Sequence, residues 1–179
     1  MSRFDKIDFD TVTENLLDNI YDEINKIRHG LQDNLENISF QQEMFWNGVY
    51  SGFLQIEELA VYLNPDFELS NDDHDSDILD LEKTGVEGFE QRLDIVQEKV
   101  DDLINQTGTD TAFLIGMRFS FILFYSQLRN VLSAIAEEDF EEFHVHLKNL
   151  VPAPTEYLFT EGNWQETYFS KVKEAGFDI

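Results

Sequence analysis

Apolar residues recur every three or four positions along most of the chain, the spacing of one helix face. No long segment shows the strict apolar-polar alternation of a half-buried strand. The pattern therefore predicts an all-α protein, a bundle of five to seven helices held mainly by aromatic packing. Long helices are expected near residues 11–29, 40–63, 85–106 and 110–136.

Residues that begin and end helices fall between these apolar segments. Thr11 and Glu14 have the spacing of a capping box, and Gly30 is a plausible end for the helix that they begin. Ser39 can cap the second long helix, and Pro65 disfavours helical geometry in the residue before it. We therefore expect a loop after the second long helix.

Shorter helices are expected near the C-terminus. Asp139 can open one helix, and Asn163 can cap a last one that Gly176 closes. We interpret the chain as a single α-helical domain over residues 1–179, in which 139–179 form the C-terminal helices.

Two of the long segments share a short motif. The sequences FWNGVYSGF (45–53) and FLIGMRFSF (113–121) both have the form F-x-x-G-x-x-x-(G/S)-F. Small residues four apart share one helix face, so another backbone can approach closely there. The motif predicts a close crossing of these helices, and a two-fold echo of the helix pairs 11–63 and 85–136, with Gly48 and Gly52 facing Gly116 and Ser120.

The third long segment carries an apolar seam at alternating three- and four-residue spacing. This seam can pack inside the bundle, or it can pair with a helix of another chain, including a second copy in a homodimer. It consists of Val86, Phe89, Leu93, Val96, Val100 and Leu103.

Composition narrows the functional classes. The 37 Asp and Glu residues against 12 Lys and Arg give a net charge of −25, which opposes binding to nucleic acid and to anionic membranes. A hydrophobic content of 42% with 16 Phe indicates a packed core and not a disordered acidic tail. Because the chain has no Cys, disulfides, thiolate zinc sites and cysteine nucleophiles are excluded.

The location expected from the sequence is the cytoplasm. The most apolar stretch, 112–125, contains Arg118 and is too short to cross a bilayer. The first residues lack the apolar core of a signal peptide.

Negative charge is concentrated between His29 and Glu82, where no Lys or Arg occurs. Residues 64–83 are expected to form an acidic loop. We expect the carboxylates of this region to form a partner-binding acidic surface: Asp33, Glu36, Glu43, Glu57, Glu58, Asp66, Glu68, Asp72, Asp73, Asp75, Asp77, Asp80 and Glu82.

Part of the acidic loop partly matches the calcium loop of an EF-hand. Ser76 stands where the sharp turn of such a loop requires Gly, so we expect at best a weak cation site in a mobile loop. Its ligands would be Asn71, Asp73, Asp75, Asp77 and Glu82.

Other candidate sites are weaker. Glu141 and His144 form one E-x-x-H pair, but a carboxylate-bundle metal site needs two such pairs. His144 and His146 lie two apart, so they do not share a helix face. Arg118 and Arg129 form one stripe with Tyr125, where they can pair with carboxylates of a neighbouring helix or hold an anionic ligand.

No phosphate-binding loop, nucleophile elbow, zinc-protease motif or dinucleotide fingerprint occurs. We therefore expect no enzyme activity, no cofactor and no resident metal.

The function expected from these features is that of an acidic inhibitor. It would occupy the nucleic-acid-binding surface of a basic partner, as phage and plasmid proteins of the anti-restriction or anti-CRISPR type do. Aromatic residues could anchor the rim of this contact: Phe67, Tyr157, Phe159 and Trp164. The alternative is a cytosolic helical adaptor or assembly protein whose acidity serves solubility.

Overall fold

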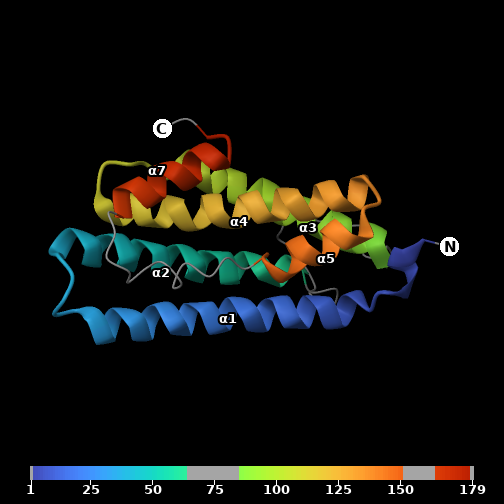
Figure 1. Cartoon of the computed structure of the whole chain (residues 1–179), viewed down its shortest axis with the longest axis horizontal. Coiled ribbons are helices and arrows are strands. Elements are labelled where there is room, and N and C mark those ends of the chain that lie inside the picture. Colours follow the sequence, from blue (N-terminus) through green and yellow to red (C-terminus); the bar gives the residue numbers. More distant parts are fainter. Residues whose placement is uncertain (1, 64–84, 151–163, 178–179) are drawn as a thin grey trace, which may run out of the picture.

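The computed structural model describes residues 2–63, 85–150 and 164–177 (Figure 1). Within these residues the protein is entirely helical, so the all-α prediction is confirmed. Two short 3-10 turns, η1 (Arg3–Lys6) and η2 (Val61–Leu63), accompany the α-helices. Six α-helices are described: α1 (Phe9–Asn34), α2 (Phe40–Ala60), α3 (Gly85–Gln106), α4 (Ala112–Ala136), α5 (Phe140–Lys148) and α7 (Trp164–Glu174).

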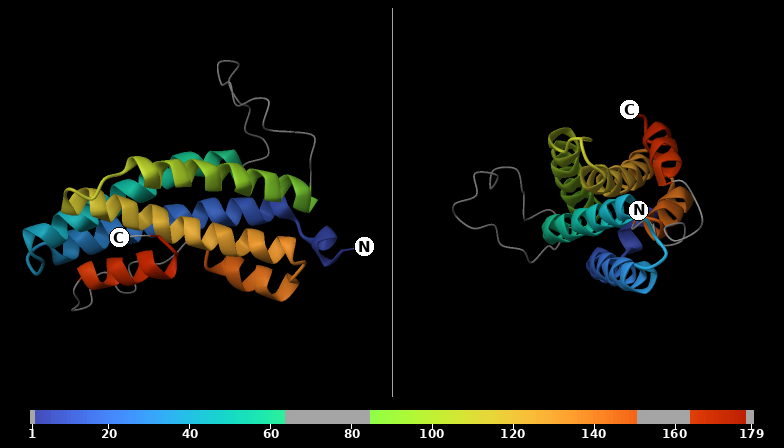
Figure 2. Two further views of the ribbon diagram at one scale, coloured as in Figure 1. Left: turned by 90° about the horizontal axis from the view of Figure 1, so that it is seen from above. Right: turned by 90° about the vertical axis from the view of Figure 1, so that its left-hand side faces the viewer.

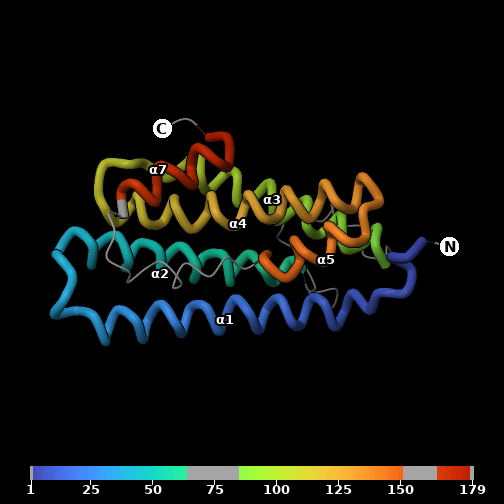
Figure 3. The backbone as a smooth tube through the Cα atoms, viewed as in Figure 1, coloured from blue at the N-terminus to red at the C-terminus, as the bar shows by residue number. Residues whose placement is uncertain are grey.

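The helices form two hairpins that meet at their second members. α1 runs antiparallel to α2, α3 runs antiparallel to α4, and α2 and α4 lie side by side in the same direction (Figure 3). Seen along the bundle, α1 and α3 lie on opposite sides of the α2–α4 pair (Figure 2, right). α5 and α7 pack against α4. The two outermost long helices are therefore α1 and α3.

The first helix is longer than predicted at both ends. Asp8, and not Thr11, is the N-cap, because its carboxylate accepts hydrogen bonds from the Thr11 amide (3.3 Å) and hydroxyl (2.9 Å). The predicted capping box of Thr11 and Glu14 is therefore wrong. The helix also continues through Gly30, which allows Leu31 to reach the core, where 8% of it is exposed. A helical Gly costs only about 1 kcal/mol, which the burial of a Leu side chain offsets.

Other predicted caps are confirmed. Ser39 and Gln42 form a reciprocal capping box at the start of α2. Asp139 caps α5, and its carboxylate accepts a hydrogen bond from a backbone amide one turn later. Gly176 follows α7 with φ +83°, the left-handed conformation that ends many helices. The predicted cap Asn163 lies outside the described residues.

The predicted crossing of α2 and α4 is present, and it is reciprocal. A Cβ atom at Gly48 would collide with the carbonyl oxygen of Phe113, three residues before Gly116. A Cβ atom at Gly116 would in turn collide with the carbonyl oxygen of Phe45, three residues before Gly48. The two helices thus touch backbone to backbone about a local two-fold axis, and neither position can hold a side chain without movement of a main chain.

One turn further along, Ser120 continues the crossing. Its hydroxyl donates a hydrogen bond to the carbonyl oxygen of Val49 at 2.9 Å, and its Cβ would lie 2.8 Å from a Cβ at Gly52. Ser120 has no exposed surface, and this bond satisfies its hydroxyl inside the core.

The apolar seam of α3 faces the inside of the bundle. Phe89, Leu93, Val96 and Val100 have no exposed surface, and the seam's end residues are partly buried against the same core. The seam is therefore used within the chain and is not available to a helix of another chain.

Phenylalanine rings close the bundle at the N-terminal end of α1. Phe9 of α1 lies 4.9 Å from Phe89 of α3 between ring centroids, and Phe4 lies 5.1 Å from Phe143 of α5 in an edge-to-face arrangement. Such aromatic pairs add stabilisation beyond burial alone. Helices distant in sequence are thus joined here by aromatic contacts, as the composition predicts.

Gly116→Ala is expected to lower the free energy of unfolding by about 1–3 kcal/mol, because overpacking against an immovable carbonyl outweighs the better helix propensity of Ala. Urea unfolding followed by circular dichroism measures this. Gly108→Ala is the matched control, because its nearest neighbour, the Asp110 carboxylate, is 3.7 Å away, an ordinary contact. Equal stability of the wild type and Gly116→Ala would contradict the crossing.

Candidate functional site

The outer face of α1 carries a row of carboxylates, called here the α1 row: Asp10, Glu14, Asp18 and Asp22. All four are exposed, and consecutive members of the row lie four residues apart, which is about 6 Å along the helix. None forms an ion pair with Lys or Arg within the described residues. Like charges at this spacing destabilise a helix, so the row is held in place by the packing of the opposite face of α1.

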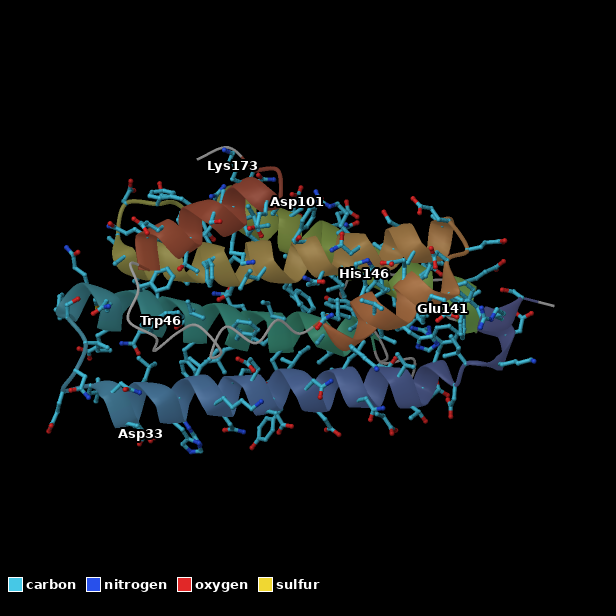
Figure 4. The ribbon with its side chains drawn as sticks, in the orientation of Figure 1. Asp33, Trp46, Asp101, Glu141, His146 and Lys173 are labelled. Carbon is cyan, nitrogen blue, oxygen red and sulfur yellow. The ribbon has the colours of Figure 1, made fainter. Side chains whose placement is uncertain are left out.

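A second row lies on α3, called here the α3 row: Glu87, Glu90, Asp94, Glu98 and Asp101. Partial burial raises the pKa of Glu90, and the neighbouring charges of Asp94 and Glu87 raise it further. Burial also raises the pKa of Asp94. Figure 4 shows Asp33 on α1 and Asp101 on α3 at opposite sides of the α2–α4 pair. The α1 row and the α3 row thus lie on different helices and form two separate groups of carboxylates.

Sequence reasoning missed both rows. It selected the region between His29 and Glu82 because no Lys or Arg occurs there. That criterion considers the order of residues along the chain and not the helix face on which each residue lies. The available signal was the three- and four-residue spacing of acids in 10–22 and 87–101, which places them on one side of each helix.

The structure divides the predicted acidic surface. Asp33, Glu36 and Glu43 lie at or beside the turn that joins α1 to α2. Glu57 and Glu58 are exposed near the other end of α2, about 21 Å away along the helix. The remaining predicted carboxylates lie in 64–84, outside the described residues: Asp66, Glu68, Asp72, Asp73, Asp75, Asp77, Asp80 and Glu82. The predicted acidic loop at 64–83 lies outside the described residues too, and so does its predicted cation site at Asn71, Asp73, Asp75, Asp77 and Glu82.

A groove lies between α1 and α2 close to this turn, and we call it the turn groove. Its volume is about 290 Å³, and it is lined by Arg28, Leu31, Gln32, Leu35, Glu43, Asn47 and Tyr50. Two large apolar side chains are exposed at the same turn, Leu35 at 48% and Phe40 at 74%. The predicted acidic residues Asp33, Glu36 and Glu43 therefore accompany a concave surface with apolar material at its edge.

The two arginines of α4 hold the C-terminal helix. Arg118 donates to the hydroxyl of Tyr168 at 3.0 Å, and Arg129 donates to the carbonyl oxygen of Ala175 at 3.1 Å. The expected pairing with carboxylates is not found within the described residues. Arg129 lies at the C-terminal end of α7, where a cation is favoured by the helix dipole. This stripe therefore docks α7, and Tyr125, its third member, packs against Phe177.

Arg92 of α3 is a buried cation, with 8% of the residue exposed. Burial lowers its pKa, and the charge of Asp10 in the α1 row opposes this effect. Its Nε atom has no hydrogen-bond partner within the described residues. Arg92 is thus a buried positive charge whose field reaches the first carboxylate of the α1 row.

The histidines of α5 point to different partners. His146 lies 3.1 Å from the carboxylate of Glu142, and His144 packs edge-on against the ring of Phe140. Glu141 pairs with Arg3 at 3.2 Å. Among the described residues, no group of three or more potential ligands is placed to hold a metal ion.

Comparison with known proteins gives no relative: no family model, no curated protein and no solved structure matches the chain. No described helix combines the length and the apolar character that a bilayer crossing requires. The predicted rim residues Phe67, Tyr157 and Phe159 lie outside the described residues, as does the side chain of Trp164.

Mild acidification is expected to stabilise the fold. A carboxyl group whose pKa is raised in the folded state binds more protons there than in the unfolded chain, so stability is lost as the pH rises through that pKa. Because the pKa of Glu90 lies above its ordinary 4.5, the melting temperature should rise as the pH is lowered from 7 through that raised pKa toward 4.5. Glu90→Gln should raise the melting temperature at pH 7 and flatten this dependence.

Glu58→Gln is the control, because it removes one negative charge outside both rows. The Asp8 cap does not oppose the effect in this range. Hydrogen bonds lower its pKa below 3.8, so its contribution is lost only at more acid pH. The partial burial of charge in the α3 row would be contradicted by a melting temperature that falls steadily as the pH is lowered from 7 toward 4.5, with the same melting temperature for Glu90→Gln and Glu58→Gln at each pH.

Proposed function

We propose that this protein is an acidic inhibitory binding protein that occupies the basic, nucleic-acid-binding surface of a protein partner through the α1 row and the neighbouring α1–α2 turn. The observation that supports this most is the α1 row itself. Its exposed carboxylates lie at regular spacing on an outer helix, and none of them forms an ion pair with Lys or Arg in the described residues. A basic surface would supply these counter-ions.

The spacing suits a surface built for phosphates. The α1 row offers one carboxylate for about every 6 Å of helix, whereas each DNA strand offers one phosphate for about every 3.4 Å. The row therefore has roughly half the linear charge density of a DNA strand. Lys and Arg side chains are flexible enough to follow such a row.

Solubility alone is a poor explanation of the charge. A small domain needs a net charge of only about 2 to 8 to remain in solution. This chain has a net charge of −25, and self-repulsion at that charge opposes the compact state. Neutralisation by a partner would offset this cost, and the long-range field would also accelerate the encounter.

The functional class is that of phage or plasmid proteins that block restriction enzymes or CRISPR nucleases in the cytoplasm. The proposal is one of shared mechanism and not of relationship. The alternative is a helical adaptor or assembly protein whose acidity serves solubility. The α3 seam does not supply its contact surface, because the central residues of the seam are buried within the chain.

Reversal of the α1 row tests the proposal. The triple variant Glu14→Lys, Asp18→Lys and Asp22→Lys should lose at least about tenfold in affinity for a nuclease that the wild type inhibits, because it places like charges against the basic surface. The matched control reverses Asp94, Glu98 and Asp101 of the α3 row. Restriction and CRISPR nucleases can be screened by DNA cleavage at low salt.

Two further properties are expected of the wild-type complex. Binding should weaken steeply with salt, because exposed charge pairs are screened over about 8–10 Å, and it should compete with duplex DNA. If the α1 reversal keeps the wild-type affinity while circular dichroism shows an intact fold, or if DNA does not compete, the α1 row is not the inhibitory surface.

A further inference from the structure

We infer that the turn groove is a docking site for a short protein segment in which an apolar side chain lies beside a Lys or Arg. This inference rests on the proposed function, since it names the part of the basic partner that the α1–α2 turn would hold. It adds to that function a specific anchoring site, which charge alone would not provide.

The floor of the groove is apolar. Leu31 is largely buried, Leu35 is 48% exposed, and Tyr50 of α2 is half-buried against the core. The volume of about 290 Å³ lies at the lower limit of sites that enclose small ligands. The space suits one or two protein side chains that enter from outside, and it is too open and small to enclose a cofactor.

The polar groups of the groove match a peptide segment. Arg28, Gln32 and Asn47 carry N–H groups that could donate hydrogen bonds to the backbone carbonyl groups of an extended segment. Glu43 offers an acceptor for an ammonium or guanidinium group. Within the described residues, no side-chain hydrogen bond or ion pair occupies Arg28, Gln32, Asn47 or Glu43.

Phe40 extends the apolar edge. It lies three residues before Glu43 and seven before Asn47, so all three share one side of α2. Phe40 is 74% exposed, so a large aromatic side chain is accessible to solvent at the turn. Exposed aromatic groups beside a concave surface with a polar rim are typical of contact centres in protein interfaces.

Charge decides which occupant fits. Three carboxylates at or beside the turn, Asp33, Glu36 and Glu43, outnumber the single cation Arg28. A second copy of this chain would bring another net charge of −25 to the same place. Charge complementarity therefore favours a basic segment, and the apolar floor favours one with a Leu or aromatic side chain next to the base.

Three synthetic peptides, each acetylated and amidated, serve as probes. Their central residues are Lys-Phe-Arg, Lys-Ser-Arg and Glu-Phe-Glu, with Gly on either side. The ¹⁵N-labelled full chain is titrated with each peptide and followed by ¹H–¹⁵N correlation spectra. The Lys-Phe-Arg peptide should shift signals of residues 28–50 in a saturable way. The Glu-Phe-Glu peptide should cause no shifts, and the Lys-Ser-Arg peptide should bind at least about tenfold more weakly.

Surface variants locate the site. Leu35→Ser and Glu43→Gln should each weaken binding of the Lys-Phe-Arg peptide, Leu35→Ser by about tenfold. Leu54→Ser and Glu57→Gln are the controls, because they alter an exposed Leu and an exposed Glu further along α2. These controls should bind within about twofold of the wild type, and circular dichroism confirms the fold of every variant.

The inference is overturned if the Phe and Ser peptides bind equally, if shifts spread evenly along the α1 and α3 rows, or if Leu35→Ser binds as the wild type does. These results are independent of the charge-reversal test. Loss of nuclease inhibition on reversal of the α1 row, with no peptide bound in the turn groove, would retain the proposed function and reject the docking site. Binding of the Lys-Phe-Arg peptide in the turn groove, together with unchanged nuclease inhibition after reversal of the α1 row, would retain the docking site and reject the proposed function.

Discussion

The rest of the structure depends on the backbone contact between α2 and α4. Gly48 and Gly116 each face a carbonyl oxygen of the other helix, and Ser120 donates a hydrogen bond to the Val49 carbonyl group one turn later. Because the contact is reciprocal, it relates α2 and α4 by a local two-fold axis. The contact places α2 and α4 at the centre of the bundle, so that α1 and α3 are the outer helices (Figure 2).

The outer position of α1 and α3 determines where the charge lies. Each of these helices buries one apolar face and turns a row of carboxylates outward, so repulsion within each row is borne by packing against the central pair. The positive charges of α4 are used elsewhere, since Arg118 and Arg129 bind α7. At the α1–α2 turn, Leu35 and Phe40 are exposed beside the turn groove, and Asp33, Glu36 and Glu43 lie at or next to the same turn. Apolar surface and a further group of carboxylates thus meet at this end of the first hairpin.

Some of this could be predicted from the sequence, because it depends on spacing within one helix. The four-residue interval of Gly48 and Gly52 repeats at Gly116 and Ser120, and the close crossing follows from it. Helix ends were less certain: Asp8 and Thr11 are both good caps, and the burial of Phe9 at 5% exposure favours the earlier one. The turn groove joins residues of two helices across a turn, so no local pattern could reveal it.

Central to this account is the claim that the carboxylates of the α1 and α3 rows are not neutralised by ion pairs within the fold. The melting temperature of the wild type between 10 mM and 500 mM NaCl tests it most directly. Salt screens repulsion between exposed like charges, so a net charge of −25 without internal counter-ions predicts a melting temperature that rises by several degrees, about 2–4 °C for each 1 kcal/mol gained. A melting temperature that stays constant or falls would mean that the charges are already balanced within the protein, and it would contradict the account.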